Sequence, residues 1–164
     1  ENGNRSGTEN TQGISGLGLA TELAYDNLAE KQLHIINLNN RLREGLMSEL
    51  DDIIVNGTID MGVDVSDYGK RFPSVLNISF LGARGEVILH TLEQDEIFVS
   101  TGSACSSHKN SDSHVLAAMG LGHKEIEGAI RFSISEFNTL EEMDEVAAKV
   151  SAAVKRFRRL GSFR

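Results

Sequence analysis

Residues 139–159 read TLEEMDEVAAKVSAAVKRFRR, and this stretch has the pattern of an amphipathic helix. Thr139 and Glu142 have the spacing of a capping box, which starts a helix. Basic residues close the stretch, where they suit the negative end of the helix dipole. The apolar stripe recurs at spacings of three and four, at Met143, Val146, Val150, Val154 and Phe157. Such a helix is stable only when its stripe packs on another apolar surface, which the preceding residues must supply.

The preceding residues predict further helices and several short strands. A long helix with one apolar stripe is expected over residues 17–50. Shorter helices are expected over residues 86–93 and 115–119, with Gly120 and Gly122 just past the second. Runs of β-branched or alternating apolar residues predict strands at 53–55, 75–80, 97–99 and 129–134.

Polar or aperiodic stretches separate these elements and predict loops at residues 1–16, 58–72 and 101–113. No repeat or boundary divides the chain. The natural way to bury the stripes is an α+β fold, in which helices pack on one face of a small mixed or antiparallel sheet.

The composition is that of one globular domain. The chain has 164 residues, and its 16 Lys and Arg against 24 Asp and Glu give a net charge of −8. Negative charge disfavours nucleic acid and anionic membranes as partners. No stretch approaches the ~20 apolar residues that span a bilayer. A lone cysteine without an export signal indicates the cytoplasm.

Cys105 lies in the polar segment STGSACSS at residues 100–107. Most free cysteines are buried, whereas a thiol on a polar loop can reach a substrate and be deprotonated. His108 is close enough in sequence to influence the thiolate. The residues alone leave two interpretations about equally open, a nucleophile and an incidental surface thiol. A zinc site of Cys105, His108 and His114 is the weaker alternative, because structural zinc needs four ligands in recognisable pairs.

Two other positions suit an anion. The turn RSGT at residues 5–8 combines a cation, a hydroxyl and backbone amides, although a plain surface turn explains it equally well. Arg131 stands in the predicted strand 129–134, where its guanidinium must be paired or face a cleft. Its planar guanidinium suits a carboxylate. By residue type alone, an ion pair with a protein carboxylate is favoured over binding of a substrate carboxylate.

Four motifs are spread over most of the chain: RSGTEN at 5–10, LNISF at 76–80, STGSACSS at 100–107 and AIRFS at 129–133. Together, in this order, they resemble the cysteine desulfurases of the NifS and IscS type. The resemblance covers the whole chain but only the C-terminal part of such an enzyme. It therefore implies the small domain of the aspartate aminotransferase fold (fold type I) of pyridoxal-phosphate enzymes.

The resemblance also implies an activity and the residues that carry it. These enzymes convert L-cysteine to L-alanine and hold the sulfur as a protein persulfide, and the GSAC form of the motif resembles the branch that serves iron–sulfur cluster assembly or related sulfur transfer. Cys105 matches the nucleophile, and Arg131 matches the arginine that grips the substrate carboxylate. Thr8 matches the residue that reaches the cofactor phosphate of the neighbouring subunit. The expected partners are L-cysteine, a sulfur acceptor or scaffold protein, and a second subunit in a homodimer.

The sequence departs from the family at the lysine that holds pyridoxal phosphate. In the family this lysine belongs to a Ser-x-His-Lys motif in the larger domain, before the RSGT turn. SSHK at residues 106–109 imitates the motif but follows Cys105, so we interpret it as coincidence. We expect one domain, with an entry loop at 1–16, a long helix at 17–50 and a small α+β domain at 51–164. The chain alone is then an inactive part of a larger enzyme or, alternatively, a noncatalytic module for dimerisation or sulfur-carrier docking.

Overall fold

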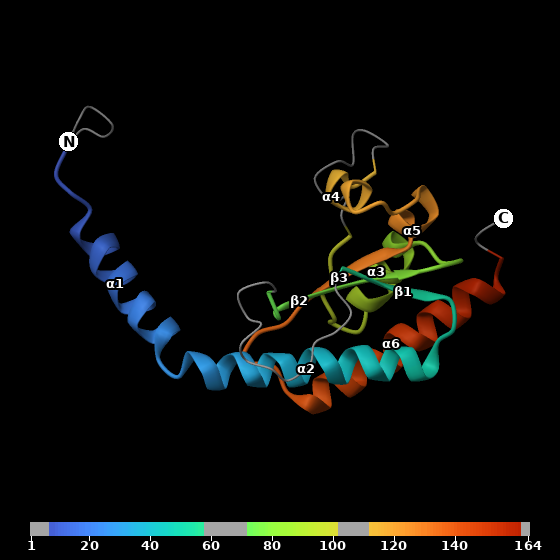
Figure 1. Ribbon diagram of the computed structural model, residues 1–164, viewed down its shortest axis with the longest axis horizontal. Helices are drawn as coiled ribbons and strands as arrows, with labels where there is room; N and C mark the ends of the chain where they lie inside the picture. Colours follow the sequence, from blue (N-terminus) through green and yellow to red (C-terminus); the bar gives the residue numbers. More distant parts are fainter. Residues whose placement is uncertain (1–6, 58–71, 102–111, 162–164) are drawn as a thin grey trace.

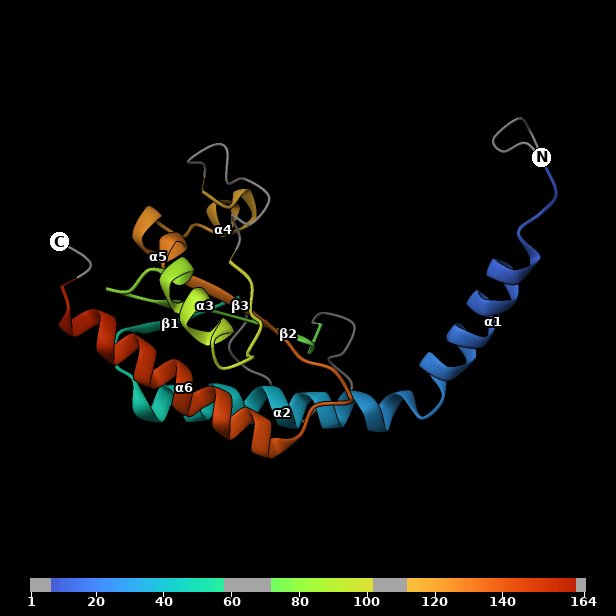
Figure 2. The ribbon, with the colours of Figure 1, turned by 180° about the vertical axis from the view of Figure 1, so that it is seen from behind.

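The computed structural model describes residues 7–57, 72–101 and 112–161 (Figure 1). Helices α2 (Leu28–Glu49) and α6 (Leu140–Arg159) lie side by side below a three-stranded sheet. Helix α1 (Thr11–Tyr25) precedes α2 and projects away from the sheet, as the opposite view also shows (Figure 2). The arrangement confirms the expected α+β class.

The sheet is antiparallel, with strand order β1-β2-β3. Its strands are β1 (Ile53–Asn56), β2 (Val75–Phe80) and β3 (Ala129–Ser133), each within a residue of its predicted bounds. The register places alternate apolar residues of the three strands on the face toward α2 and α6: Ile53, Val55, Leu76, Ile78, Phe80, Ile130 and Phe132. Three shorter helices complete the described elements: α3 (Gly85–Glu93), α4 (His114–Ala118) and α5 (His123–Glu127).

The core forms where the stripes of α2 and α6 meet the sheet. Leu38, Leu46, Val150 and Val154 are fully buried, which confirms the stripe predicted for α6 and the α2 part of the stripe predicted over 17–50. The first part of that stripe, from Leu17 to Leu28, is exposed. The two helices approach closely at Gly45, where an added Cβ would lie 3.0 Å from the Cβ of Ala147. A side chain at position 45 would therefore push the helices apart.

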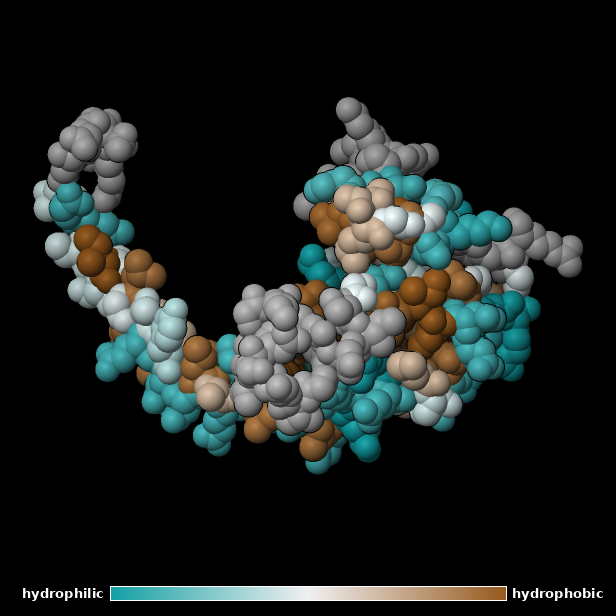
Figure 3. Space-filling model, in the orientation of Figure 1, coloured by the Kyte–Doolittle hydropathy of each residue, from teal (hydrophilic) through white to brown (hydrophobic). Residues whose placement is uncertain are grey.

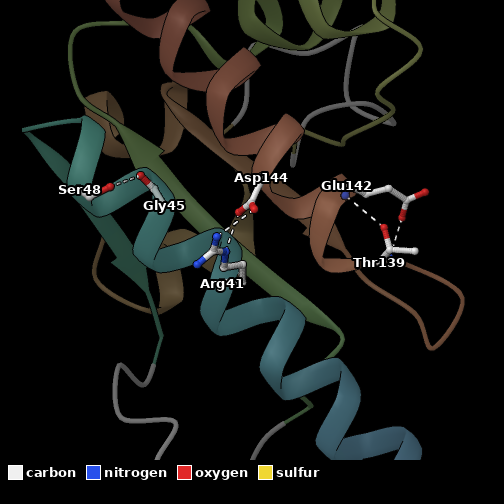
Figure 4. Close-up of polar contacts among 6 residues, drawn as sticks. All are labelled: Arg41, Gly45, Ser48, Thr139, Glu142 and Asp144. Carbon is white, nitrogen blue, oxygen red and sulfur yellow. Dashed lines mark hydrogen bonds and ion pairs between the residues drawn. The ribbon is translucent and has the colours of Figure 1, made fainter.

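Ion pairs link the outer faces of α2 and α6. The guanidinium of Arg41 donates to both carboxylate oxygens of Asp144, at 2.6 and 2.9 Å (Figure 4). This hydrogen bonding lowers the pKa of Asp144. Lys155 Nζ pairs with Glu49 at 2.6 Å. These groups are exposed, so the pairs orient the helices and contribute little stability.

The predicted capping box at the start of α6 is confirmed (Figure 4). The backbone N–H of Glu142 donates to Thr139 Oγ1 at 3.2 Å, and the backbone N–H of Thr139 donates to Glu142 Oε2 at 2.9 Å. Hydrogen bonds from the Asn138 side chain and the Thr139 backbone lower the pKa of Glu142. Two backbone donors at the helix start are thus satisfied.

We expect Thr139→Ala to lower the free energy of unfolding by about 1 kcal/mol, because the first turn of α6 loses its hydroxyl acceptor. Urea unfolding of this chain measures the change. Ser48→Ala is the matched control, since the Ser48 hydroxyl only donates to the carbonyl of Gly45 within α2 (Figure 4), and alanine is a good helix former. Equal losses in the two variants would contradict a special role for the cap.

The N-terminal helix was predicted with the wrong bounds. The loop expected over 1–16 ends earlier, because α1 begins at Thr11, where the Asn10 side chain accepts a hydrogen bond from the N–H of Gly13 at 3.1 Å. The helix expected over 17–50 is also divided in two. Asn27 has a φ of 52°, a left-handed conformation that asparagine tolerates, and α2 begins directly after it.

Two shorter predictions also differ from the structure. Residues 97–99 form no strand, since Ile97 and Val99 pack against the core and only Ser100 forms a bridge to β3. Apolar packing explains their pattern without a ladder of hydrogen bonds. Helix α5 was not predicted, because its five residues are too few to show an apolar period.

The remaining short helices follow the prediction. Helix α3 is confirmed, and so is α4, beyond which Gly120 adopts a φ of 89°. Most residues of the predicted loops at 58–72 and 101–113 lie outside the described residues. No helix in the described ranges is long and apolar enough to cross a membrane.

Candidate active site

A row of polar residues crosses the sheet on the face opposite α2 and α6. Asn56 of β1 pairs with Asn77 of β2, which pairs with Arg131 of β3. Arg131 in turn forms an isolated bridge with Ser100. Because side chains alternate between the two faces of a sheet, these residues share one face, and we call Asn56, Asn77, Arg131 and Ser100 the polar row.

Arg131 is the only charged member of the polar row. Its backbone N–H donates to the Ser100 carbonyl at 2.7 Å, and the Ser100 N–H donates to the Arg131 carbonyl at 3.1 Å. The residue is exposed, and its guanidinium has no hydrogen bond or ion pair with any residue in the described ranges. The internal ion pair that its residue type favours is therefore not found in that part of the chain, and the fork can accept a carboxylate.

Asparagine side chains form the other half of the polar row. Asn56 Nδ2 donates to Asn77 Oδ1 at 2.6 Å and to Ser79 Oγ at 2.7 Å. Ser79 is fully buried, whereas Asn56 and Asn77 are half-buried. The hydrogen bond to Asn77 Oδ1 therefore comes from β1, on the opposite side of β2 from Arg131. Sequence analysis missed Asn56 and Asn77, although asparagine inside a strand is unusual enough to mark them.

The segment that contains Cys105 starts at the polar row. Residues 102–111, including Cys105 and His108, lie outside the described residues. Ser100 precedes Cys105 by five positions, which corresponds to at most about 18 Å of extended chain. After the segment, His123 Nδ1 and Asp112 Oδ1 pair at 2.8 Å, and the side chain of Ser113 caps α4. Both flanks of the segment are therefore attached to the folded body.

The zinc alternative gains no ligands from the described residues. His114 begins α4, but its proposed co-ligands Cys105 and His108 are outside the described ranges. Within those ranges, no three His, Cys, Asp or Glu residues are grouped so that they could hold a metal ion.

The structure does not bring Thr8 to the polar row. Thr8 is exposed and lies just before α1, the helix that projects from the body (Figures 1 and 2). No residue of α1 is buried, and its apolar side chains are exposed at intervals along the arm (Figure 3). Of the three candidate residues, only Arg131 is part of the described body of the fold.

Comparisons with known proteins agree with the motifs. The family model described as aminotransferase class-V matches residues 2–146. A cysteine desulfurase IscS of Clostridium botulinum is 39% identical over 160 residues, which cover 98% of this chain and 38% of that protein. A cysteine desulfurase of Sinorhizobium fredii is 40% identical over 158 residues, 96% of this chain and 38% of that protein. The chain thus spans less than two fifths of the length of these curated relatives.

Solved structures show the same fold. A NifS-like protein from Rickettsia africae superposes with a TM-score of 0.70 at 28% identity, over 92% of this chain and 36% of that one. A second NifS-like protein gives a TM-score of 0.63 at 30% identity, over 98% of this chain and 36% of that one. The expected relation to the NifS-like, fold type I enzymes is therefore confirmed.

Proposed function

We propose that this chain, which belongs to the aminotransferase class-V family, is part of a cysteine desulfurase. In the proposed reaction the carbon–sulfur bond of L-cysteine breaks and its sulfur bonds to Sγ of Cys105. The products are L-alanine, whose methyl group gains a proton, and a persulfide on Cys105. Arg131 binds the carboxylate of the substrate and so fixes its orientation. The balance needs no external oxidant or reductant.

The observation that carries this proposal is the guanidinium of Arg131, which has no partner among the described residues, beside the start of the Cys105 segment. Arg131 and Ser100 are joined by two backbone hydrogen bonds, so the carboxylate-binding group and the segment with the nucleophile share one anchor. An exposed arginine without a carboxylate partner in the described ranges is suited to a substrate carboxylate. The incidental-thiol interpretation of Cys105 gives no reason for this juxtaposition.

The full-length protein that contains this chain provides the direct test. Incubation with L-cysteine should yield L-alanine, and a peptide containing Cys105 should gain the mass of one sulfur atom. Alanine without sulfur on that peptide would place the nucleophile elsewhere. Neither product from a cofactor-loaded protein would refute the proposed function.

Enzymes of this family use pyridoxal phosphate, which stabilises the negative charge that develops on the substrate carbon. The described residues do not by themselves fit this group. Lys31, Lys149 and Lys155 are engaged with the Leu23 carbonyl, Asp95 and Glu49. The fourth described lysine, Lys124, is exposed on α5 and does not line the cavity beside β3. That cavity, of about 280 Å³ between β3 and α6, is lined by four carboxylates, Asp95, Glu96, Glu142 and Glu145, which would repel a phosphate. We propose only that Thr8 reaches the cofactor phosphate of a neighbouring subunit.

Titration of this chain alone with pyridoxal phosphate is expected to give no stoichiometric visible band from a lysine-bound cofactor. The physical reason is that three of the four described lysines, Lys31, Lys149 and Lys155, already have partners. The fourth, Lys124, is exposed on α5 and does not line the cavity beside β3, which is acidic. Absorption spectroscopy is the measurement, and Lys109→Ala is the matched variant. A saturable band that disappears in Lys109→Ala would show that the SSHK motif at 106–109 holds the cofactor.

The remaining parts of the proposal concern partners. The persulfide sulfur passes to an acceptor or scaffold protein, in iron–sulfur cluster assembly or related sulfur transfer, and the enzyme acts as a homodimer in the cytoplasm. The lone cysteine supports a reducing compartment. The relatives named cysteine desulfurase support the substrate.

A noncatalytic module for dimerisation or sulfur-carrier docking is the second candidate function. The exposed apolar residues of α1, among them Leu17 and Leu23, favour it because exposed apolar side chains gain stability when another surface covers them. The full-length protein separates the two candidates. The noncatalytic module predicts association without any alanine from L-cysteine, whereas the desulfurase predicts alanine.

A further inference from the structure

Asn77 lies directly beside Arg131 in the polar row, and the N–H donors of its side-chain amide have no acceptor among the described residues. Asn77 Oδ1 accepts the hydrogen bond from Asn56 Nδ2 at 2.6 Å. Its own Nδ2 group carries two further N–H donors. Neither finds an acceptor among residues 7–57, 72–101 and 112–161.

The backbone pairing brings the side chains of Asn77 and Arg131 especially close. Arg131 uses both its N–H and its carbonyl to bond Ser100, so these groups point away from β2. Asn77 and Arg131 therefore form a non-hydrogen-bonded pair of the antiparallel ladder. In such pairs the Cα atoms are only about 4.5 Å apart and the side chains lie closest.

Asn56 fixes which end of the Asn77 amide faces Arg131. Because Asn56 holds the oxygen of Asn77 on the β1 side, the amide nitrogen is left on the side of β3. The arrangement leaves Asn56 Oδ1 buried without a partner in the described part of the chain. Such an unsatisfied atom costs stability, and a role for the orientation of Asn77 explains why it is retained.

We propose that Asn77 is a substrate-contacting residue that recognises the same carboxylate as Arg131. The inference rests on the proposed function. A carboxylate offers about four acceptor sites, and a bidentate guanidinium uses two of them. The amide of Asn77 donates to a third, on the flank that Arg131 leaves open. Asn56 is then a positioning residue, because it acts through the orientation of Asn77.

The test compares two substrates in the full-length protein. L-cysteinamide carries a neutral amide in place of the carboxylate but keeps the thiol and the amine. The measured quantity is the ratio of kcat/KM for L-cysteine to kcat/KM for L-cysteinamide. Asn77→Ala should lower this ratio about tenfold, because a hydrogen bond to a charged group is lost. Asn77→Asp should lower it further, since a carboxylate at this position repels the substrate and occupies the fork of Arg131.

Ser133→Ala is the matched control. Ser133 is exposed on the same face of β3 but pairs with Val75. Its loss should leave the ratio within about twofold of wild type, which is the scatter of a surface substitution. Asn77→Asp nearly preserves the shape of the side chain, so it keeps the test informative even if Asn77→Ala folds poorly.

The outcomes separate the two proposals. Turnover of L-cysteine by the wild-type protein, together with a lowered ratio in both Asn77 variants, would support the inference. Active Asn77 variants that keep the wild-type ratio would overturn the inference but leave the proposed function standing. Equal losses of kcat/KM for both substrates, together with a lower melting temperature, would also overturn the inference, because they indicate a structural role for Asn77. A wild-type protein that releases no sulfur from L-cysteine would overturn the proposed function and this inference together.

Discussion

Cys105→Ser in the full-length protein is expected to reduce persulfide formation to below about a thousandth of the wild-type rate. A serine hydroxyl stays protonated near neutral pH, and oxygen cannot replace a thiolate in the attack on sulfur. The cofactor spectrum should be unchanged, because the substitution exchanges only the sulfur of the nucleophile for oxygen and alters no group of the cofactor site. Sulfide release in the presence of dithiothreitol measures the rate.

Ser103→Ala is the control for this prediction, because it lies in the same segment and has no proposed chemical role. Its sulfide release should match that of wild type. If Cys105→Ser also kept a near-normal rate, the thiol would be an incidental surface group and the nucleophile would lie elsewhere in the protein.

Arg131→Ala in the full-length protein should raise the KM for L-cysteine tenfold to a hundredfold or more. A charge-assisted hydrogen-bonded pair contributes about 1.5–3 kcal/mol, and about 1.4 kcal/mol corresponds to a factor of ten in binding. Arg131→Lys should recover only part of the loss, because an ammonium cannot bind both carboxylate oxygens at once. Steady-state kinetics and the cofactor spectrum on the same preparation check both statements.

Thermal unfolding distinguishes this role from a structural one. Arg131 is exposed and its guanidinium has no partner in the described ranges, so Arg131→Ala should leave the melting temperature nearly unchanged. A lower melting temperature with a wild-type KM would instead show that the guanidinium forms an internal ion pair.

The sequence predicts the fold well wherever an apolar period coincides with a clear end signal. Helix α6 has both, in its stripe and in the capping box of Thr139, and its start is correct to the residue. Strand β2 alternates cleanly and is also correct. The break between α1 and α2 was missed, because it depends on the left-handed backbone of Asn27, and no apolar residue changes its period there.

The residues of the candidate site also differ in how well the sequence predicts them. Arg131 could be singled out from sequence because a charge between Ile130 and Phe132 interrupts an apolar strand. Asn77 is polar and neutral, and its place beside Arg131 follows only from the register of β2 and β3, whose residues are far apart in the chain. The alternating pattern decides which face of the sheet a residue takes, but no short turn joins β2 to β3 to fix which residues stand opposite each other.

The packing of α2 against α6 also sets an order of events during synthesis. Arg41 and Asp144 are 103 positions apart, and Glu49 and Lys155 are 106 apart. A ribosome that adds about 5–20 residues per second needs about 5–20 s to cover this separation. During that interval the stripe of Leu38, Leu42 and Leu46 has emerged without the helix that covers it. The nascent chain therefore lacks the α6 cover of this stripe until α6 is made, and chaperones that hold apolar segments can bind there during that interval.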